Sequence, residues 1–187
     1  MPESYTQIAS PREVDATIER IATEIITNHS TTNPLFVALL RGAAPFASKL
    51  MFAMANQAPD FQPEIDYMMV RTYGTSKHAG SPQIKTNLSP ETKEHLAGRP
   101  VIVIDDVLDL GITTNFVSEH LKSLGATKVE IAVLAQKNVE RHYDIIPTYC
   151  GFDAGDKWLV GMGMDDANAG NEAYRWESGI WEKTVTD

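Results

Sequence analysis

Apolar runs of strand length alternate along this chain with segments whose apolar residues recur at helical spacing. The runs at residues 35–40, 65–71, 101–104 and 129–134 predict strands of a buried sheet. Helical spacing occurs at residues 11–28, from Pro45 onward and through 113–124. This alternation predicts an α/β fold with a central, mainly parallel sheet flanked by helices and connected by right-handed crossovers.

Local sequence signals indicate where the helices begin and end. Ser10 precedes Pro11, and Glu13 follows three positions after the serine, which is a capping box with proline at the first helical position. Pro45 can start the second helix in the same way. Gly125 stands where the third helix should end.

The remaining segments are polar or short. Residues 73–82 are rich in turn formers and predict a mobile loop. Apolar pieces at 149–152 and 158–162 either complete the sheet or form a lobe over its edge. We expect one domain over residues 1–187, with a small hood formed by terminal segments, mainly about 148–187.

Composition narrows the possible classes of protein. Sixteen Lys and Arg against 25 Asp and Glu give a formal net charge of −9, which disfavours a nucleic-acid-binding surface as the main function. Cys150 is the only cysteine, so no intramolecular disulfide and no paired-cysteine zinc site can form, and the five histidines lack metal-ligand spacing. With no basic, apolar leader and no membrane-length apolar run, we expect a cytoplasmic protein that is not membrane-embedded.

The most informative segment is the stretch from Val101 to Thr114. Four aliphatic residues lead to Asp105 and Asp106, and a third acid, Asp109, comes before a glycine and two threonines that open a helix. Ligands gather at the carboxyl edge of a parallel sheet, and a helix start binds phosphate. Carboxylates beside it can hold sugar hydroxyls, a metal ion or a proton. The segment therefore predicts a ligand that carries phosphate, a sugar and a protonatable group.

This segment resembles the 5-phosphoribosyl-1-pyrophosphate signature of the type I phosphoribosyltransferases. The magnesium-holding strand of P-loop NTPases is a rival, but it requires an upstream G-x-x-x-x-G-K-[ST], which this chain lacks. A buried strand that ends in solvated acids is the plainest alternative, and it leaves Asp109, the glycine and the threonines unexplained.

Further segments from about Leu35 to Arg175 narrow the resemblance to the hypoxanthine-guanine phosphoribosyltransferases. It implies that Asp105 and Asp106 bind the ribose hydroxyls directly or through Mg²⁺, and that Asp109 is the acid or base near purine N7. It also implies a cradle for the 5′-phosphate, made by Leu110, Gly111, Ile112, Thr113 and Thr114. The family often has threonine where this chain has Leu110, so one hydroxyl contact is lost.

Two other segments resemble loops of that family. Leu40-Arg41-Gly42 resembles the pyrophosphate loop, which commonly contains a cis non-proline peptide, here Leu40–Arg41. Thr72-Tyr73, with the polar stretch to Lys85, resembles the flexible loop that closes over the active site. Judged by the residues alone, a solvated Arg41 in an ordinary turn and a surface loop without a catalytic role remain open.

The purine and metal positions come from the same resemblance. Lys137 matches the lysine that donates to the purine O6, Trp158 the aromatic that stacks on the base, and Leu159 a backbone contact to the purine edge. Asp165 matches a second Mg²⁺ ligand and Arg175 a pyrophosphate contact, in a segment, 165–175, that is longer than is usual in the family. A solvated lysine at a strand end and a core tryptophan are the plain alternatives.

The resemblance implies a magnesium-dependent purine salvage enzyme, working as a homodimer or homotetramer. It would transfer phosphoribosyl to N9 of hypoxanthine or guanine, giving IMP or GMP and pyrophosphate. Three alternatives stay open: a xanthine-preferring relative, a non-catalytic regulator that senses the donor and binds RNA or DNA, and a synthetase of the donor or another relative of the fold. The synthetase predicts an ATP site, of which the sequence has no sign.

Overall fold

The computed structural model describes residues 1–72 and 81–184, which form two sheets and four helices within those ranges. In chain order the elements are β1 (Tyr5–Ala9), α1 (Pro11–Asn28), β2 (Leu35–Leu40), α2 (Ala44–Gln57), β3 (Glu64–Thr72), β4 (Pro82–Thr86), α3 (Pro90–Leu96), β5 (Pro100–Leu108), α4 (Ile112–Ser123), β6 (Lys128–Lys137), β7 (Tyr149–Ala154), β8 (Leu159–Val160) and β9 (Ile180–Lys183).

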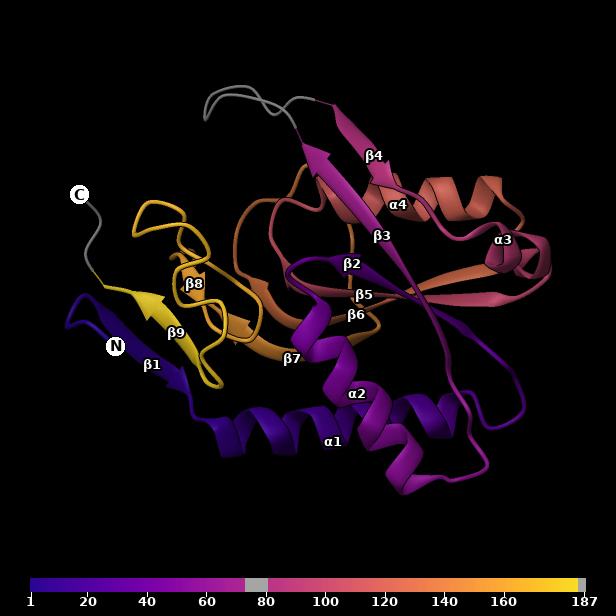
Figure 1. Cartoon of the computed structure of the whole chain (residues 1–187), viewed down its shortest axis with the longest axis horizontal. Coiled ribbons are helices and arrows are strands. Elements are labelled where there is room, and N and C mark those ends of the chain that lie inside the picture. Colours follow the sequence, from indigo (N-terminus) through magenta and orange to yellow (C-terminus); the bar gives the residue numbers. More distant parts are fainter. Residues whose placement is uncertain (73–80, 185–187) are drawn as a thin grey trace.

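The larger sheet has the strand order β4-β3-β2-β5-β6-β7, and the smaller has the order β1-β9-β8 (Figure 1). Strands β2, β3, β5, β6 and β7 are parallel, and β4 alone is antiparallel to its neighbour. Chain order and sheet order differ because helices return the chain across the faces of the sheet. The predicted mainly parallel α/β fold is thereby confirmed.

The three helices predicted from local sequence signals are present. Helix α1 spans the predicted residues, and its capping box is formed: the Ser10 hydroxyl accepts from the Glu13 amide, and the Glu13 carboxylate accepts from the Ser10 amide at 2.8 Å. Helix α2 begins one residue before Pro45. Helix α4 ends at Ser123, and Gly125 follows with a left-handed φ of +98°.

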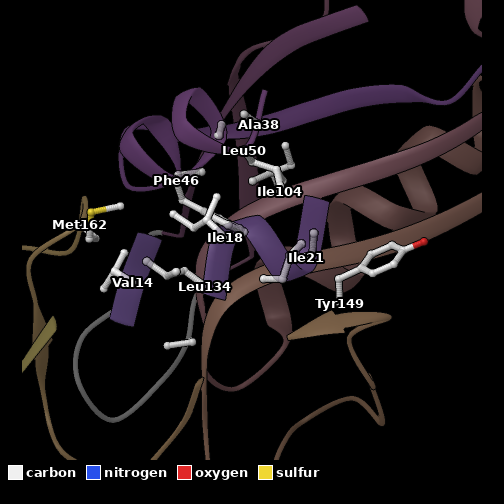
Figure 2. Close-up of a cluster of buried hydrophobic side chains, with 14 of the residues drawn as sticks. Val14, Ile18, Ile21, Ala38, Phe46, Leu50, Ile104, Leu134, Tyr149 and Met162 are labelled. Atoms are coloured by element: carbon white, nitrogen blue, oxygen red, sulfur yellow. The ribbon is translucent and has the colours of Figure 1, made fainter. Parts of the chain in front are cut away.

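Both faces of the larger sheet are covered, because alternate residues of its strands point to opposite sides. Phe36 and Ala38 of β2 pack in the core cluster that contains the buried faces of α1 and α2. Val37, between them, packs in a second cluster with residues of α3 and α4. Figure 2 shows the first cluster, to which both Ile18 of α1 and Ile104 of β5 belong. With both faces occupied, the carboxyl edge of the sheet is left for ligands.

Four elements were not expected from the sequence: β1, β4, α3 and β9. Strand β4 pairs with β3, so the expected loop does not extend to Lys85. That part of the prediction is wrong because Ile84 alternates with polar neighbours, as in an edge strand with one solvated face. The rest of the expected loop, Tyr73 included, lies in residues 73–80, outside the described part of the chain.

The two C-terminal apolar pieces separate between the sheets. Strand β7 runs parallel to β6 and completes the larger sheet, whereas β8 is only two residues long and pairs with β9. The smaller sheet also takes β1 from the other end of the chain, and Figure 1 shows β1 beside β9 over the end of α1. Among residues 1–72 and 81–184, no helix is long and apolar enough to cross a membrane.

Candidate active site

Strand β5 carries the paired acids, Asp105 and Asp106, near its C-terminal end. It was expected to end at Ile104 but continues to Leu108, because Asp105 and Val107 keep their register with β6. The Asp106 amide donates to Asp105 Oδ1 and the Val107 amide to Asp106 Oδ1, each at 3.0 Å. Both carboxylates are therefore held at the carboxyl edge of the sheet.

Desolvation dominates the electrostatics of this acid pair. It raises the pKa of Asp105 well above its usual range, and the adjacent charge of Asp106 raises that pKa further. Desolvation also raises the pKa of Asp106, while the positive charge of Arg175 acts in the opposite direction. Such a pair gains from a cation or from hydroxyl donors placed between or beside its oxygens.

A cavity of about 550 Å³ opens over the acid pair. Its walls include Arg41 and Gly42 after β2, residues 105–106 of β5, the whole stretch 109–114, and Asp165 and Arg175 from the segment after β8. Residues predicted from separate parts of the chain thus line one cavity. Arg71 of β3 also lines it and was missed, although a basic residue at the carboxyl end of a strand is a usable signal.

The predicted phosphate loop forms the start of α4. Gly111 is the N-cap, with a left-handed φ of +76°, a conformation that a side chain at this position would disfavour. The Asn115 amide donates to the Gly111 carbonyl and so makes the first internal hydrogen bond of the helix. The amides of residues 112–114 come before it and have no carbonyl within the helix to bind. Thr113 is half-buried and Thr114 is buried at the cavity wall. Free amides and the positive end of the helix dipole make this turn suited to an anion.

The loop after β2 approaches the acid pair through a glycine. The Leu40–Arg41 peptide is cis, as predicted. A Cβ on Gly42 would lie 2.0 Å from Asp106 Oδ2, and one on Gly163 would lie 1.7 Å from the Gly42 carbonyl oxygen. The Gly42 backbone therefore packs against the Asp106 side chain and against the Gly163 backbone, with no room for a Cβ at either glycine.

A smaller cavity of about 140 Å³ adjoins the first, because Asp106, Asp109 and Asp165 line both. Its other walls include Lys137, Trp158 and Leu159. Together the two cavities extend from the start of α4 to Leu159 of β8.

Lys137 and Trp158 both make contacts that suit the second cavity. Lys137 is 8% exposed, and its Nζ donates to Asp109 Oδ2 at 3.0 Å. The same ammonium lies 5.5 Å from the centroid of the Trp158 ring. Trp158 is 51% exposed, so it is not a core tryptophan, and its Nε1 donates to the Asp165 carbonyl at 2.8 Å. Lys137 is likewise not simply solvated.

Arg175 lies at the cavity but is bound to its own chain. It is 7% exposed, and its Nη2 lies 2.9 Å from Asp165 Oδ1. It also donates to the Gly163 carbonyl and to Glu172. Glu172 contacts Arg41 as well, at 2.6 Å, and was not singled out from the sequence, because one acid in a polar segment carries no periodic signal.

The described residues place few groups where a metal ion could be held by protein alone. No cluster of three or more His, Cys, Asp or Glu side chains with that geometry occurs among them.

Thr72 ends β3 opposite Pro82, and Tyr73 falls outside the described residues.

Comparisons with known proteins agree on one family. A family model described as "Phosphoribosyl transferase domain" matches residues 4–167. The hypoxanthine-guanine phosphoribosyltransferase of Bacillus subtilis is 29% identical over 168 residues, which cover 90% of this chain and 87% of that protein. The hypoxanthine-guanine-xanthine phosphoribosyltransferase of Tritrichomonas foetus is 27% identical over 157 residues, covering 83% and 81%. Among solved structures, a hypoxanthine phosphoribosyltransferase of Staphylococcus aureus superposes with a TM-score of 0.83 at 24% identity, covering 95% and 90%.

Proposed function

Because the chain belongs to the phosphoribosyl transferase domain family, we propose that it transfers the phosphoribosyl group of 5-phosphoribosyl-1-pyrophosphate to N9 of hypoxanthine or guanine. The products are IMP or GMP and pyrophosphate, and the role is purine salvage. One observation carries the proposal: a helix start suited to an anion, a desolvated acid pair and a lysine–tryptophan pocket line two cavities that share Asp106, Asp109 and Asp165.

The donor lies along the larger cavity. Its 5′-phosphate accepts from the amides at the start of α4, where residues 110–114 line the wall. Its ribose hydroxyls lie over Asp105 and Asp106, whose raised pKa values reflect a site that favours added positive charge or hydroxyl donors. Arg41, Gly42 and Arg175 line the end of the cavity that takes the pyrophosphate.

The purine occupies the smaller cavity. Lys137 has three ammonium donors, and one reaches Asp109, so others remain for the O6 acceptor of a 6-oxopurine. Adenine offers an amino donor at that position and is disfavoured. The base stacks on Trp158, worth about 1–3 kcal/mol for an aromatic on a base, and Leu159 borders its edge.

Asp109 manages the proton of the base during transfer. As N9 forms its bond to the anomeric carbon and the bond to the pyrophosphate oxygen breaks, the purine must lose a proton, which the Asp109 carboxylate accepts. The nearby carboxylates also stabilise the positive charge that develops on the sugar. Lys137 keeps the Asp109 carboxylate in place at 3.0 Å.

The acids of the site fit Mg²⁺, although the chain alone does not complete a metal site. Asp105, Asp106 and Asp165 offer the hard carboxylate oxygens that this ion prefers. Among residues 1–72 and 81–184, no group of three or more His, Cys, Asp or Glu side chains has the geometry to hold a metal ion without other ligands. When bound, the ion neutralises charge on the pyrophosphate leaving group.

Several finer points belong to the same proposal. The protein works in the cytoplasm as a single domain whose smaller sheet covers the site, and it assembles as a homodimer or homotetramer. Analytical ultracentrifugation tests the assembly, and a protomer that stays monomeric while fully active would remove that part.

The test is pyrophosphate release with hypoxanthine, guanine, xanthine and adenine, for wild type and Asp109→Asn. We expect turnover with hypoxanthine and guanine, little with adenine, and a decrease of about 10²–10⁴-fold in kcat for the variant. Donor binding by calorimetry should change little. Asp60→Asn, an exposed acid between α2 and β3, is the matched control. Unchanged turnover in Asp109→Asn would remove the acid–base assignment, and xanthine as the best substrate would favour the xanthine-preferring alternative.

The same assay tests the regulator. If the wild-type protein binds the donor but turns over none of the four bases, the protein is a sensor of the donor and not an enzyme. The formed Lys137–Asp109 pair supports the enzyme, because a sensor has no need for an acid–base group beside a base pocket.

A further inference from the structure

Glu172 joins the two arginines of the pyrophosphate end of the site. Its Oε1 lies 2.6 Å from Arg41 Nη2, and its Oε2 contacts Arg175 Nε. Both arginines line the large cavity, whereas Glu172 lies outside that lining. One carboxylate outside the cavity lining therefore binds the same two guanidinium groups that a pyrophosphate inside the cavity would contact.

The backbone of this segment is shaped to present the carboxylate. Glu172 and Tyr174 have left-handed φ values of +58° and +61°, which are unusual for residues with side chains and persist only where surrounding contacts enforce them. The ring of Tyr174 packs on Tyr5 of β1 with centroids 4.9 Å apart. The smaller sheet thus helps to hold Glu172 between the arginines.

Both arginines are paired with acids of the chain itself. Arg41 and Arg175 supply two positive charges, and Glu172 and Asp165 supply two negative ones in direct contact with them. The Arg41 side chain is 57% exposed, so it can turn from Glu172 toward the cavity, whereas Arg175 is buried and engaged on three sides. A guanidinium paired with a carboxylate has fewer donors left for a phosphate.

We propose that Glu172 is an internal counter-anion that competes with pyrophosphate for Arg41, and so limits the affinity for this leaving group and speeds its release. The inference rests on the proposed function, because it takes pyrophosphate as the ligand of Arg41. Glu172 holds the guanidinium in the free protein, yields it to the bound pyrophosphate, and recaptures it as the product leaves. Glu172 is in this sense a positioning residue, since it acts through Arg41.

The sign of the effect separates this role from simple scaffolding. If Glu172 only held Arg41 in a binding pose, removing its charge would weaken pyrophosphate binding. Competition predicts the opposite, since Glu172→Gln keeps an oxygen acceptor for Arg175 but gives up the ionic hold on Arg41. We expect magnesium pyrophosphate to bind roughly threefold to tenfold more tightly to Glu172→Gln than to wild type.

Isothermal titration calorimetry with magnesium pyrophosphate tests this expectation. Glu177→Gln is the matched control, because it removes the same charge from an exposed position of the same segment and should bind like wild type. In an Arg41→Gln background the effect of Glu172→Gln should vanish, since its target is gone. Affinity for GMP, whose phosphate binds at residues 110–114, should not change. Glu172→Ala is a second variant with the same expected direction, and circular dichroism checks that each variant is folded.

The outcomes separate this inference from the proposed function. Wild type that binds pyrophosphate while Glu172→Gln and Glu172→Ala bind it equally or more weakly overturns the counter-anion role alone. An equal change in GMP affinity, or an effect that survives Arg41→Gln, also overturns it. Wild type that binds no pyrophosphate overturns the proposed function together with this inference.

Discussion

Replacing Gly42 by alanine should disable the site while leaving the fold largely intact. The new Cβ would lie 2.0 Å from Asp106 Oδ2 and 2.5 Å from Asp106 Cγ, where ordinary contacts begin at 3.4 Å. The atoms therefore have to separate by about 1.4 Å, either by moving the Asp106 carboxylate or by moving the loop that carries Arg41. Each movement displaces a group proposed to bind the donor.

The magnitude follows from where the displacement falls. A shift of about 1 Å at a positioning group can cost about 10²-fold in rate, so kcat/KM should decrease by about 10²-fold or more. The free energy of unfolding should decrease by only about 1–3 kcal/mol, because overpacking at one side-chain end can relax locally. The Val107 amide, which holds Asp106 Oδ1 at 3.0 Å, resists the simpler rotation of the carboxylate.

The assay combines initial rates of pyrophosphate release with urea unfolding, for Gly42→Ala and for Gly155→Ala. The second variant makes the same chemical change where a Cβ would meet nothing within 4 Å, so it should behave as wild type in both measurements. A Gly42→Ala protein with the rate constants of wild type would refute the close approach of the loop to Asp106. An equal loss in both variants would show a general effect of added methyl groups.

Three further predictions concern the base pocket and the smaller sheet. Lys137→Met should lower the preference for hypoxanthine over adenine by roughly 10-fold or more, because a hydrogen bond from a charged donor contributes about 1.5–3 kcal/mol; steady-state kinetics with both bases measures it. Trp158→Ala should raise KM for the base by roughly 5- to 100-fold and Trp158→Phe by much less, and equal KM values in all three proteins would exclude stacking. Burial of Asp166 opposes its ionisation, but hydrogen bonds from Tyr5 and Lys183 outweigh burial and lower the pKa of Asp166. The ionised Asp166 therefore stabilises the fold at pH values above its unfolded-state pKa, and this stabilisation is lost as the pH falls through its folded-state pKa. Urea unfolding between about pH 2 and pH 5 should therefore show a shallower acid loss for Asp166→Asn than for wild type, and parallel profiles would contradict this.

The parts of the site that could be predicted from sequence are local. Strand, acids, glycine and helix start lie within residues 101–114, so neighbours in the chain are also neighbours in space. The same holds for Arg41 and Gly42 directly after β2. Family resemblance added Lys137, Trp158 and Asp165, whose meeting at one cavity no local pattern could reveal.

The elements that were missed have two different causes. Strand β1 pairs with β9, which is almost the whole chain away, and neither strand is long or apolar enough to be distinct. Helix α3 carried a usable signal, because Ser89 caps it by accepting from the Thr92 amide and Pro90 follows at the first position. It was missed because it is seven residues long and Leu96 is its one aliphatic residue, so no helical spacing of apolar residues can be seen.

The groups that tune the site were beyond sequence reasoning. Glu172 and Asp166 lie in a polar segment without periodicity, and their partners are arginine, lysine and tyrosine side chains from distant elements. Only the folded arrangement shows that one acid bridges two cavity arginines and that the other ties the smaller sheet to the segment after β8.

The central claim is that the two adjoining cavities together seat a nucleotide from the start of α4 to Trp158. A crystal structure with bound GMP tests it most directly. We expect the phosphate on the amides of residues 110–114, the ribose beside Asp105 and Asp106, and the base against Trp158 with its O6 toward Lys137. GMP bound with its phosphate away from α4, or with its base outside the Lys137–Trp158 pocket, would contradict the account.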